Sequence, residues 1–273
     1  MKEKWSGERL ETFIYSRDAV EHLHRYAIAK DIVEDKVVLD IACGEGYGSY
    51  LMSKNSRFVY GVDIDSKSVD AAKIKYKEGN LEFRIGTVDA IPLNDNSVDI
   101  VTSFETLEHH ELHNEMMVEI KRVLKPSGCA IISTPDKLYY SDERNFKNEF
   151  HKKELYKEEF VSLVERHFNF NQMLNQIFVN GNSIIQIDND DHKIELIYKG
   201  DYTILDEVKI SPLYMIAIVS DVGFKMLSPS VFDGSQITEK KIIDIKSEIY
   251  KSNSYKIGHL LLSPFRLVKT ILK

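Results

Sequence analysis

The sequence predicts an α/β fold in which a parallel sheet carries helices on both faces. The first observation is an apolar run over residues 37–39 that ends at Asp40 and leads into a glycine-rich turn. The second is another apolar run, over 58–62, that ends at Asp63. The third is that strand and helix patterns alternate from residue 36 to about 170, and alternating elements of this kind form parallel sheets.

The turn after the first strand has glycine at alternate positions, Gly44, Gly46 and Gly48, so bare backbone can lie against a ligand. An acid at the tip of the second strand, here Asp63, is where nucleotide-binding βαβ units hold a ribose diol. Ser49 stands where a dinucleotide-binding turn has a further glycine, and the sequence has no Walker-type phosphate loop. A nucleoside without a pyrophosphate therefore fits better than NAD or ATP. The alternative is a glycine-rich turn without a ligand.

The later elements follow from apolar periodicity and turn residues. Strands are expected over 81–86, 98–104, 129–134, 168–170 and 213–219, and helices over about 111–125 and 155–164. With these elements, residues 36–170 resemble the class I S-adenosylmethionine (SAM) methyltransferases. The resemblance implies a Rossmann-like methyltransferase sheet of seven strands with helices on both faces, the last strand being antiparallel.

The same resemblance implies SAM as the cofactor. Asp63 is expected to hold the ribose hydroxyls, and Asp89, followed by the small residue Ala90, matches the position that faces the adenine amino group. Arg25 or Tyr26 is expected to cover the cofactor or meet its carboxylate, although a plain amphipathic helix explains the same pattern. The other members of the expected cofactor site are Asp40, Ala42, Gly44, Gly46, Ile64 and Phe104.

Three regions are expected along the chain. Residues 1–35 form an N-terminal helical cap with a helix over about 17–32, residues 36–225 form the methyltransferase domain, and residues 226–273 form a C-terminal helical extension. Within the domain, turn residues between short β-branched runs at about 180–211 predict a β-hairpin insertion before the last strand.

Catalytic groups are expected after the fourth strand, because open α/β sheets bind ligands beyond the carboxyl ends of their strands. Methyl transfer to a hydroxyl needs in-line placement and a base for the proton, and histidine titrates near neutral pH. His109 is the first candidate base and His110 the second. The alternative is that Glu and His residues here only stabilise a helix start.

The spacing Glu105-x-x-Glu108-His109 resembles the ubiquinone-biosynthesis O-methyltransferases, in which this triplet is associated with a divalent metal. Two carboxylates and one imidazole suit Mg²⁺ or Mn²⁺ beside an acceptor oxygen, whose pKa the metal would lower. The resemblance thus implies Glu105, Glu108 and His109 as metal ligands, and Glu105 is also a candidate catalytic residue.

The segment from Asn148 to Glu154 resembles the Asn-x-Phe-His-x-x-Glu element of a bacterial methyltransferase subgroup associated with surface-polysaccharide and sugar modification. Glu149 replaces the Pro of many members, and Gly7-Glu8-Arg9 matches the same subgroup. His151 is expected to be a base or an acceptor-orienting group, with a backbone-bonded neighbour of a helix cap as the alternative. The polar and aromatic stretch over 135–147 suits a loop that closes over a hydroxyl-rich acceptor.

Composition limits the classes of partner. A net charge of −7 offers no basic field for phosphates, so nucleic-acid binding is not expected. The two cysteines lie in apolar strand contexts, which is typical of a reducing cytoplasm. The N-terminus lacks the apolar core of a signal peptide, and no apolar run reaches the ~20 residues that span a bilayer. We therefore expect a cytoplasmic location.

Residues 255–273 contain four basic residues and no acid, in a chain that is acidic overall. Ser263-Pro264 favours a helix start, after which apolar residues fall on one side and cations at i, i+3 and i+7. Such a basic amphipathic helix is expected to lie on the inner face of an anionic membrane or on an acidic partner. Packing on the protein's own core is the alternative.

Together these features predict a SAM-dependent methyltransferase that modifies a hydroxyl of a sugar, a nucleotide sugar or a surface glycan. The alternative acceptor is a quinone-type phenol. A protein of a different class, a non-catalytic SAM-binding regulatory subunit, would share the cofactor site, but His109 and His151 argue against it.

Overall fold

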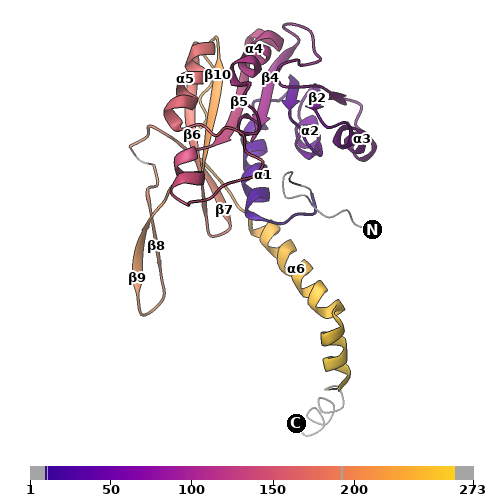
Figure 1. Ribbon diagram of the computed structural model, residues 1–273, viewed down its shortest axis with the longest axis vertical. Helices are drawn as coiled ribbons and strands as arrows, with labels where there is room; N and C mark the ends of the chain where they lie inside the picture. Colours follow the sequence, from indigo (N-terminus) through magenta and orange to yellow (C-terminus); the bar gives the residue numbers. More distant parts are fainter. Residues whose placement is uncertain (1–9, 11, 192, 262–273) are drawn as a thin grey trace.

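The computed structural model describes residue 10, residues 12–191 and residues 193–261. A central sheet of nine strands is covered by helices, and a two-stranded ribbon and a long helix extend from one end of the body (Figure 1). The strands of the central sheet are β1 (Val37–Ile41), β2 (Phe58–Asp63), β3 (Leu81–Ile85), β4 (Val98–Phe104), β5 (Leu124–Pro135), β6 (Phe170–Val179), β7 (Asn182–Ile187), β10 (Tyr214–Ser220) and β11 (Ser230–Phe232). The helices are α1 (Arg17–Ala29), α2 (Tyr47–Ser53), α3 (Ser66–Lys75), α4 (His113–Val123), α5 (Lys157–His167) and α6 (Ser235–Lys251), with short helical turns η1 (Leu107–His109) and η2 (Leu138–Asp142).

The strand order of the sheet is β3-β2-β1-β4-β5-β10-β6-β7-β11. The pairs among β1 to β5 are parallel, and β10 runs antiparallel between β5 and β6, as predicted for the last strand. The carboxyl ends of the five parallel strands therefore meet at one edge, where open α/β sheets bind their ligands. The predicted α/β class is confirmed.

The predicted count of seven strands is wrong, because two further strands extend the sheet. Asn180 and Gly181 have φ of 50° and 86°, and positive φ at both central residues suits a two-residue hairpin turn. This turn brings Val179 opposite Asn182 and folds β7 back along β6, and β11 then pairs with β7. The first part of the predicted insertion at 180–211 thus belongs to the main sheet.

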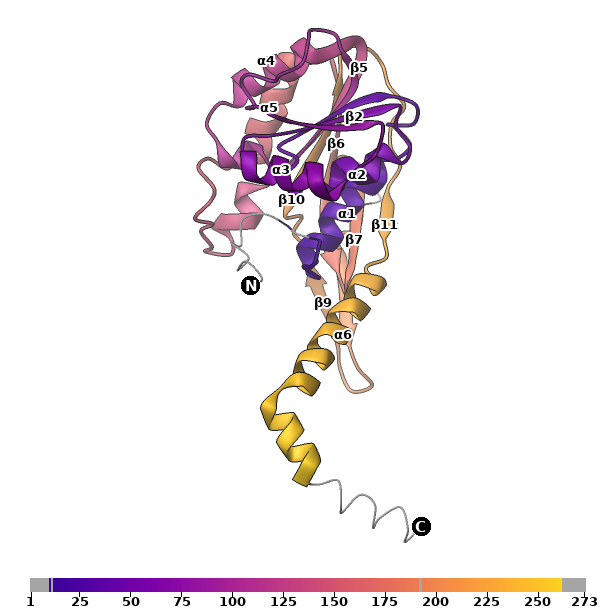
Figure 2. The same ribbon diagram turned by 90° about the vertical axis from the view of Figure 1, so that its right-hand side faces the viewer.

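Two apolar cores lie on opposite faces of the sheet, because successive strand residues point to opposite sides (Figure 2). On one face, α4 and α5 bury residues such as Met116 and Phe160. On the other face, α1 and α2 bury residues such as Ala29 and Met52. The N-terminal helix α1 therefore packs directly on the sheet beside the glycine-rich turn.

Most elements begin and end within a few residues of their predicted limits. α1 begins after Ser16, whose hydroxyl accepts a backbone N–H of the first turn, and it ends at Ala29 instead of about residue 32. The sixth strand begins at Phe170, because Phe168 ends α5 by donating its N–H to the carbonyl of Val164.

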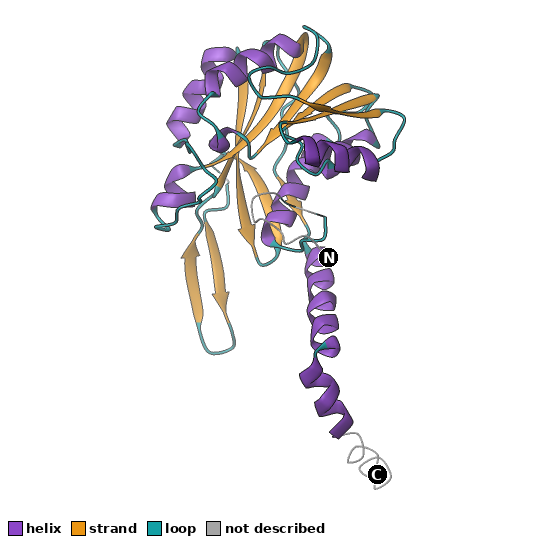
Figure 3. Ribbon diagram, turned by 45° about the vertical axis from the view of Figure 1, so that its right-hand side comes forward, coloured by secondary structure: helices purple, strands orange, loops and turns teal. Residues whose placement is uncertain are grey.

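The C-terminal part extends beyond the body. β8 (Leu196–Gly200) and β9 (Leu205–Lys209) form a ribbon separate from the main sheet. α6, in which no residue is buried, and a further helical segment over 253–261 lead away from the sheet (Figure 3). Among the described residues, no helix is both long and apolar enough to cross a membrane. The Ser263-Pro264 helix start and the Gly7-Glu8-Arg9 match lie outside the described residues.

Gly48→Ala is expected to destabilise the protein, because a Cβ at this position would lie 1.9 Å from Cζ of Tyr26. Overpacking of this kind costs about 1–3 kcal/mol and here would displace α1 from the glycine-rich turn. Urea unfolding followed by circular dichroism measures the free energy of unfolding. Gly79→Ala is the matched control, since no atom lies within 4 Å of a Cβ there. An equal effect of both substitutions would contradict the packing of Tyr26.

Candidate functional site

The glycine-rich turn between β1 and α2 forms the floor of the candidate site. Ala42, Gly44 and Gly46 have φ of 60°, 54° and 84°, so the backbone passes through the left-handed region directly after the strand. A Cβ on Gly44 would meet no atom within 4 Å. The backbone at Gly44 is therefore open to close approach by a ligand.

Asp63 lies at the tip of β2 beside this turn. Its Oδ2 accepts the N–H of Gly44 at 2.7 Å, and its Oδ1 accepts the N–H of Asp65 at 2.9 Å. These bonds fix the carboxylate between the turn and the start of α3. The structure thus brings Asp63 and the glycines together, as the spacing predicts for a site that binds a nucleoside.

Asp40 lies beneath the turn. Its buried carboxylate accepts hydrogen bonds from the hydroxyls of Ser49 at 2.7 Å, Thr102 at 2.8 Å and Tyr26 at 3.5 Å. Burial raises the pKa of Asp40 to about 6. Both oxygens accept hydrogen bonds from the protein, so Asp40 supports the turn from beneath.

The other predicted cofactor residues divide into an exposed and a buried group. Ile64, Asp89 and Ala90 are exposed after the ends of β2 and β3. Phe104 and Tyr26 are buried with their rings edge-to-face, 5.0 Å between centroids. Burial raises the pKa of Tyr26 well above its ordinary value, which keeps the hydroxyl protonated. α1 therefore supplies a wall of the site through Tyr26.

A second group of side chains lies beyond β4. Glu105 has a left-handed φ of 54°, accepts a hydrogen bond from the hydroxyl of Ser133 at 2.7 Å, and pairs with Nη1 of Arg25 at 3.3 Å. The guanidinium of Arg25 is fully buried, lies 4.4 Å from the ring centroid of Tyr214, and donates from Nε to Gln176 at 2.8 Å. Glu105 is thus directed toward α1 and β10.

Glu108, His109 and His151 come together, with one potential ligand atom from each inside a 4.8 Å group. Of the predicted set, Glu108 and His109 thus lie together with His151, whereas Glu105 pairs with Arg25. Burial raises the pKa of Glu108 well above its ordinary value, and the charge of Glu105 adds to this effect.

Hydrogen bonds fix the orientation of both imidazoles in this cluster. Nδ1 of His109 donates to the carbonyl of Phe150 at 3.1 Å. Nδ1 of His151 donates to Glu154 at 2.5 Å, and Nε2 of the same ring accepts from the amide of Asn148 at 3.0 Å. Burial lowers the pKa of His151 below its ordinary value of 6.5. His151 is therefore neutral at pH 7, with its lone pair on Nε2.

His110, the second predicted base, makes local contacts. Its Nδ1 accepts the N–H of Leu112 at 3.1 Å, and its ring lies edge-on to that of His113. Burial lowers the pKa of His110 to about 4. His109 instead lies edge-on to His151, with 5.2 Å between the ring centroids.

Aromatic side chains line the cluster on the side of the loop over 135–147. Tyr140 of η2 stacks on His151 with 5.3 Å between centroids, and its ring lies 5.8 Å from that of Tyr214. The Tyr140 hydroxyl also accepts from the amide of Asn148 at 3.3 Å. Sequence reasoning missed Tyr214, since it sits in a continuous apolar run that gives no sign of its contact with Arg25.

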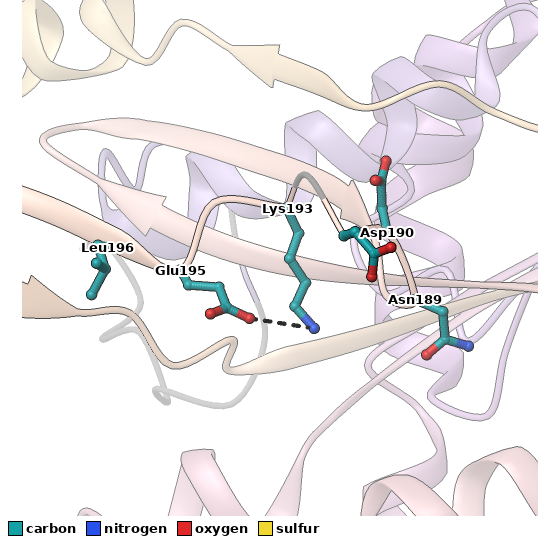
Figure 4. Close-up of a pocket in the computed structure, with 6 residues that line it drawn as sticks. Asn189, Asp190, Lys193, Glu195 and Leu196 are labelled. Atoms are coloured by element: carbon teal, nitrogen blue, oxygen red, sulfur yellow. Dashed lines mark ion pairs between the residues drawn. The ribbon is translucent and has the colours of Figure 1, made fainter.

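A separate cavity of about 560 Å³ lies at the loop between β7 and β8 (Figure 4). Its lining is Asn189, Asp190, Asp191, Lys193, Glu195 and Leu196. Lys193 and Glu195 form an ion pair across it at 3.6 Å. Because this lining is loop side chains of both charges and shares no residue with the two groups above, the cavity is not part of the candidate site.

Comparison with known proteins identifies the region around the glycine-rich turn. Residues 39–132 match the family described as "Methyltransferase domain". The chain is 36% identical over 129 residues to a probable S-adenosylmethionine-dependent methyltransferase of Mycolicibacterium smegmatis, covering 47% of this chain and 49% of that protein. It is 29% identical over 125 residues to a ubiquinone biosynthesis O-methyltransferase of Coxiella burnetii, covering 45% of this chain and 50% of that protein. The chain thus spans about half the length of the curated relatives it matches.

The fold is also similar to solved structures. A SAM-dependent methyltransferase of Thermotoga maritima, described as a possible histamine N-methyltransferase, aligns with a TM-score of 0.54 at 17% identity. The alignment covers 75% of this chain and 90% of that one. At this identity the likeness concerns the fold alone.

Asp63→Ala is expected to weaken SAM binding at least tenfold, because hydrogen bonds to a charged group contribute roughly 1.5–3 kcal/mol each. Calorimetric titration with SAM measures the change, and circular dichroism checks that the fold is intact. Asp70→Ala, which removes an exposed acid from α3, is the matched control. Unchanged SAM affinity in Asp63→Ala, or binding of NAD by the unaltered protein, would contradict the assignment of Asp63.

Proposed function

We propose that this protein, whose residues 39–132 match a methyltransferase-domain family, transfers the methyl group of SAM to a hydroxyl oxygen of its acceptor. The observation that carries the proposal is the hydrogen-bonded series Glu154, His151 and Asn148 beside the carboxyl edge of the sheet. An imidazole that is oriented by a carboxylate and keeps a lone pair on its other nitrogen is the arrangement of a general base.

The cofactor half of the site follows from the turn after β1. The backbone at Gly44 and the carboxylate of Asp63 would hold the nucleoside of SAM, and the exposed Asp89 would face its adenine. The sulfonium of SAM is already a good leaving group. The protein therefore has two tasks, which are to place the acceptor oxygen in line with the methyl group and to remove the hydroxyl proton.

His151 is assigned the second task. The acceptor oxygen forms its bond to the methyl carbon while the carbon–sulfur bond breaks and leaves its electron pair on sulfur. The hydroxyl proton passes to Nε2 of His151, which in this structure accepts from the amide of Asn148. The carboxylate of Glu154 stabilises the imidazolium that forms. The products are a methyl ether and S-adenosylhomocysteine.

Two alternatives to His151 as the base remain. In the first, His109 takes the proton, and in the second, a bound metal activates the acceptor oxygen. The carboxylate of Glu108 and the imidazoles of His109 and His151 form a donor set of one oxygen and two nitrogens. This set suits Mn²⁺ better than it suits Mg²⁺, because Mg²⁺ prefers ligands that are all oxygen. Both rings donate from Nδ1 to an oxygen acceptor, as metal-bound histidines do. A bound ion would act as a Lewis acid that lowers the pKa of the acceptor oxygen. We favour the base, because the Glu154 carboxylate on Nδ1 would stabilise the imidazolium that proton transfer forms.

The acceptor that we propose is a sugar, a nucleotide sugar or a surface glycan. Its support is the Asn148–Glu154 element together with Tyr140, since aromatic rings beside polar groups suit the faces of a sugar. A quinone-type phenol is the alternative, supported by the similarity to a ubiquinone biosynthesis O-methyltransferase. A regulatory subunit without turnover would not need the orientation that Glu154 imposes on His151.

His151→Ala is expected to lower kcat by about 10²–10⁴-fold and to leave SAM affinity near normal, since it removes the general base alone. The assay offers sugar nucleotides, lipid-linked glycans and catechol-type phenols in parallel and detects methylated product by mass spectrometry. His167→Ala, at the end of α5, is the matched control. Full activity in His151→Ala would move the base role to His109 or to the acceptor itself.

Glu154→Gln tests the same base through pH. Activity requires neutral His151, so it falls as pH drops through the pKa of that group. The hydrogen bond to Glu154 raises this pKa, and its loss should shift the acidic limb of the rate profile to lower pH and reduce kcat. An unshifted acidic limb would show that another group titrates.

Removal of divalent ions with EDTA is expected to leave methyl transfer intact, because the proposed base needs no metal. The measurement compares kcat in EDTA with kcat after addition of Mn²⁺ or Mg²⁺. Abolished turnover that returns with Mn²⁺ would transfer the chemistry to a metal held by Glu108, His109 and His151.

A further inference from the structure

Among the described residues, the helix α6 contacts the body near its beginning. A Cβ on Gly181 would lie 3.5 Å from the side chain of Thr238, and Nζ of Lys240 lies 5.7 Å from the ring centroid of Tyr15. Beyond these contacts the helix leads away from the sheet in every view (Figures 1, 2 and 3). In a globular protein the apolar face of a helix normally packs on the core, so the exposed residues that follow need an explanation.

Three large apolar side chains share one face of α6. Ile242, Ile245 and Ile249 follow one another at i, i+3 and i+7, so they lie on one face of α6. Their exposed fractions are 45%, 47% and 51%. Other exposed large apolar residues of the two helices lie outside this face, at Ile243, Tyr250, Ile257, Leu260 and Leu261. The opposite side of α6 carries Lys240, Asp244, Ser247, Glu248 and Lys251.

The charge of the sequence changes sign along the same stretch. After Glu248 the chain contains no acid to its last residue. In the described part, Lys251 and Lys256 follow, and the sequence continues with three further basic residues. The whole chain nevertheless has a net charge of −7. The net charge of the residues up to Glu248 is therefore more negative than −7, and the unbalanced positive charge lies at one end of the chain. An anionic surface would attract this end and repel the body.

A second exposed apolar element lies at the same end of the molecule. The β8–β9 ribbon extends in the same direction as α6 in Figure 1 and after each rotation about the vertical axis. Its turn exposes Tyr202 fully, and Ile204 and Leu205 are exposed by 57% and 80%. Two paired strands without a covering layer are only marginally stable in water, so contact with a surface would stabilise the ribbon.

We propose that α6 and the helical segment 253–261 bind the surface of an anionic membrane, with their apolar side in the interface. Such helices combine an apolar face with Lys and Arg residues and with aromatic residues at the headgroup level. A coiled coil with a second copy is disfavoured, because α6 ends at Lys251 after a face of only three isoleucines, whereas coiled-coil seams continue over at least three to four heptads. A parallel pair would also place the basic ends of two chains side by side. The proposal does not depend on the methyl-transfer reaction.

Cosedimentation with vesicles tests the proposal on the full chain without SAM or acceptor. The protein should bind vesicles that mix phosphatidylglycerol with phosphatidylcholine, bind pure phosphatidylcholine much less, and dissociate as salt rises from about 0.05 M to about 0.5 M. The double variant Ile245→Gln and Ile249→Gln should lower the partition coefficient at least tenfold, because it removes apolar area without a change of charge.

The matched control is the double variant Asp244→Gln and Glu248→Gln, which makes two substitutions to the same residue on the polar side of the same helix. It should bind at least as well as the unaltered chain, since it removes two acids. Both variants should keep the melting temperature, because α6 has no buried residue. Failure to bind anionic vesicles, or equal binding to neutral ones, overturns the proposal. Ultracentrifugation that shows a dimer, lost in the Ile variant, would instead assign the face to a second copy.

Discussion

A buried ion pair connects the two halves of the candidate site, and much of the structure depends on it. Arg25 of α1 pairs with Glu105 after β4, lies on the ring of Tyr214 in β10, and donates to Gln176 in β6. The pair therefore fixes the N-terminal helix to the strands that lie next to the acceptor loop. Removing one partner of a buried pair leaves an uncompensated charge and typically costs 3–5 kcal/mol. The charge of Glu105 also acts on the neighbouring cluster, where it helps to raise the pKa of Glu108.

The same edge of the sheet contains several carboxyl groups whose burial changes their titration. Asp40 has its pKa raised from 3.8 to about 6 by burial, so folding takes up a proton between these values. Its contribution to stability is consequently lost as pH rises through that window. At neutral pH the buried carboxylate of Asp40 therefore lowers the stability of the fold. The same carboxylate accepts hydrogen bonds from Ser49 and Thr102, which hold the glycine-rich turn in place.

The similarity to known proteins is distributed unevenly over the molecule. The match to the methyltransferase family covers residues 39–132, which include the turn, Asp63 and Glu108. His151 and Glu154 lie outside this range, and so do Tyr140, the β8–β9 ribbon and α6. The family match therefore covers the region proposed to bind SAM, whereas His151, Glu154, Tyr140 and the exposed C-terminal helices lie outside the matched residues.

The sequence by itself determined the α/β class, the glycine-rich turn and the acid at the tip of β2, because these depend on periodicity and on spacing within one βαβ unit. Only the tertiary structure decided that the sheet has nine strands, since the pairing of β11 with β7 joins segments about 45 residues apart. It likewise decided that His151 joins Glu108 and His109, and that Asp40 supports the turn from below. Arg25, Glu105 and Tyr214 belong to three elements distant along the chain. No local pattern encodes such contacts, because they arise from how the elements pack and not from the order of residues within any one of them.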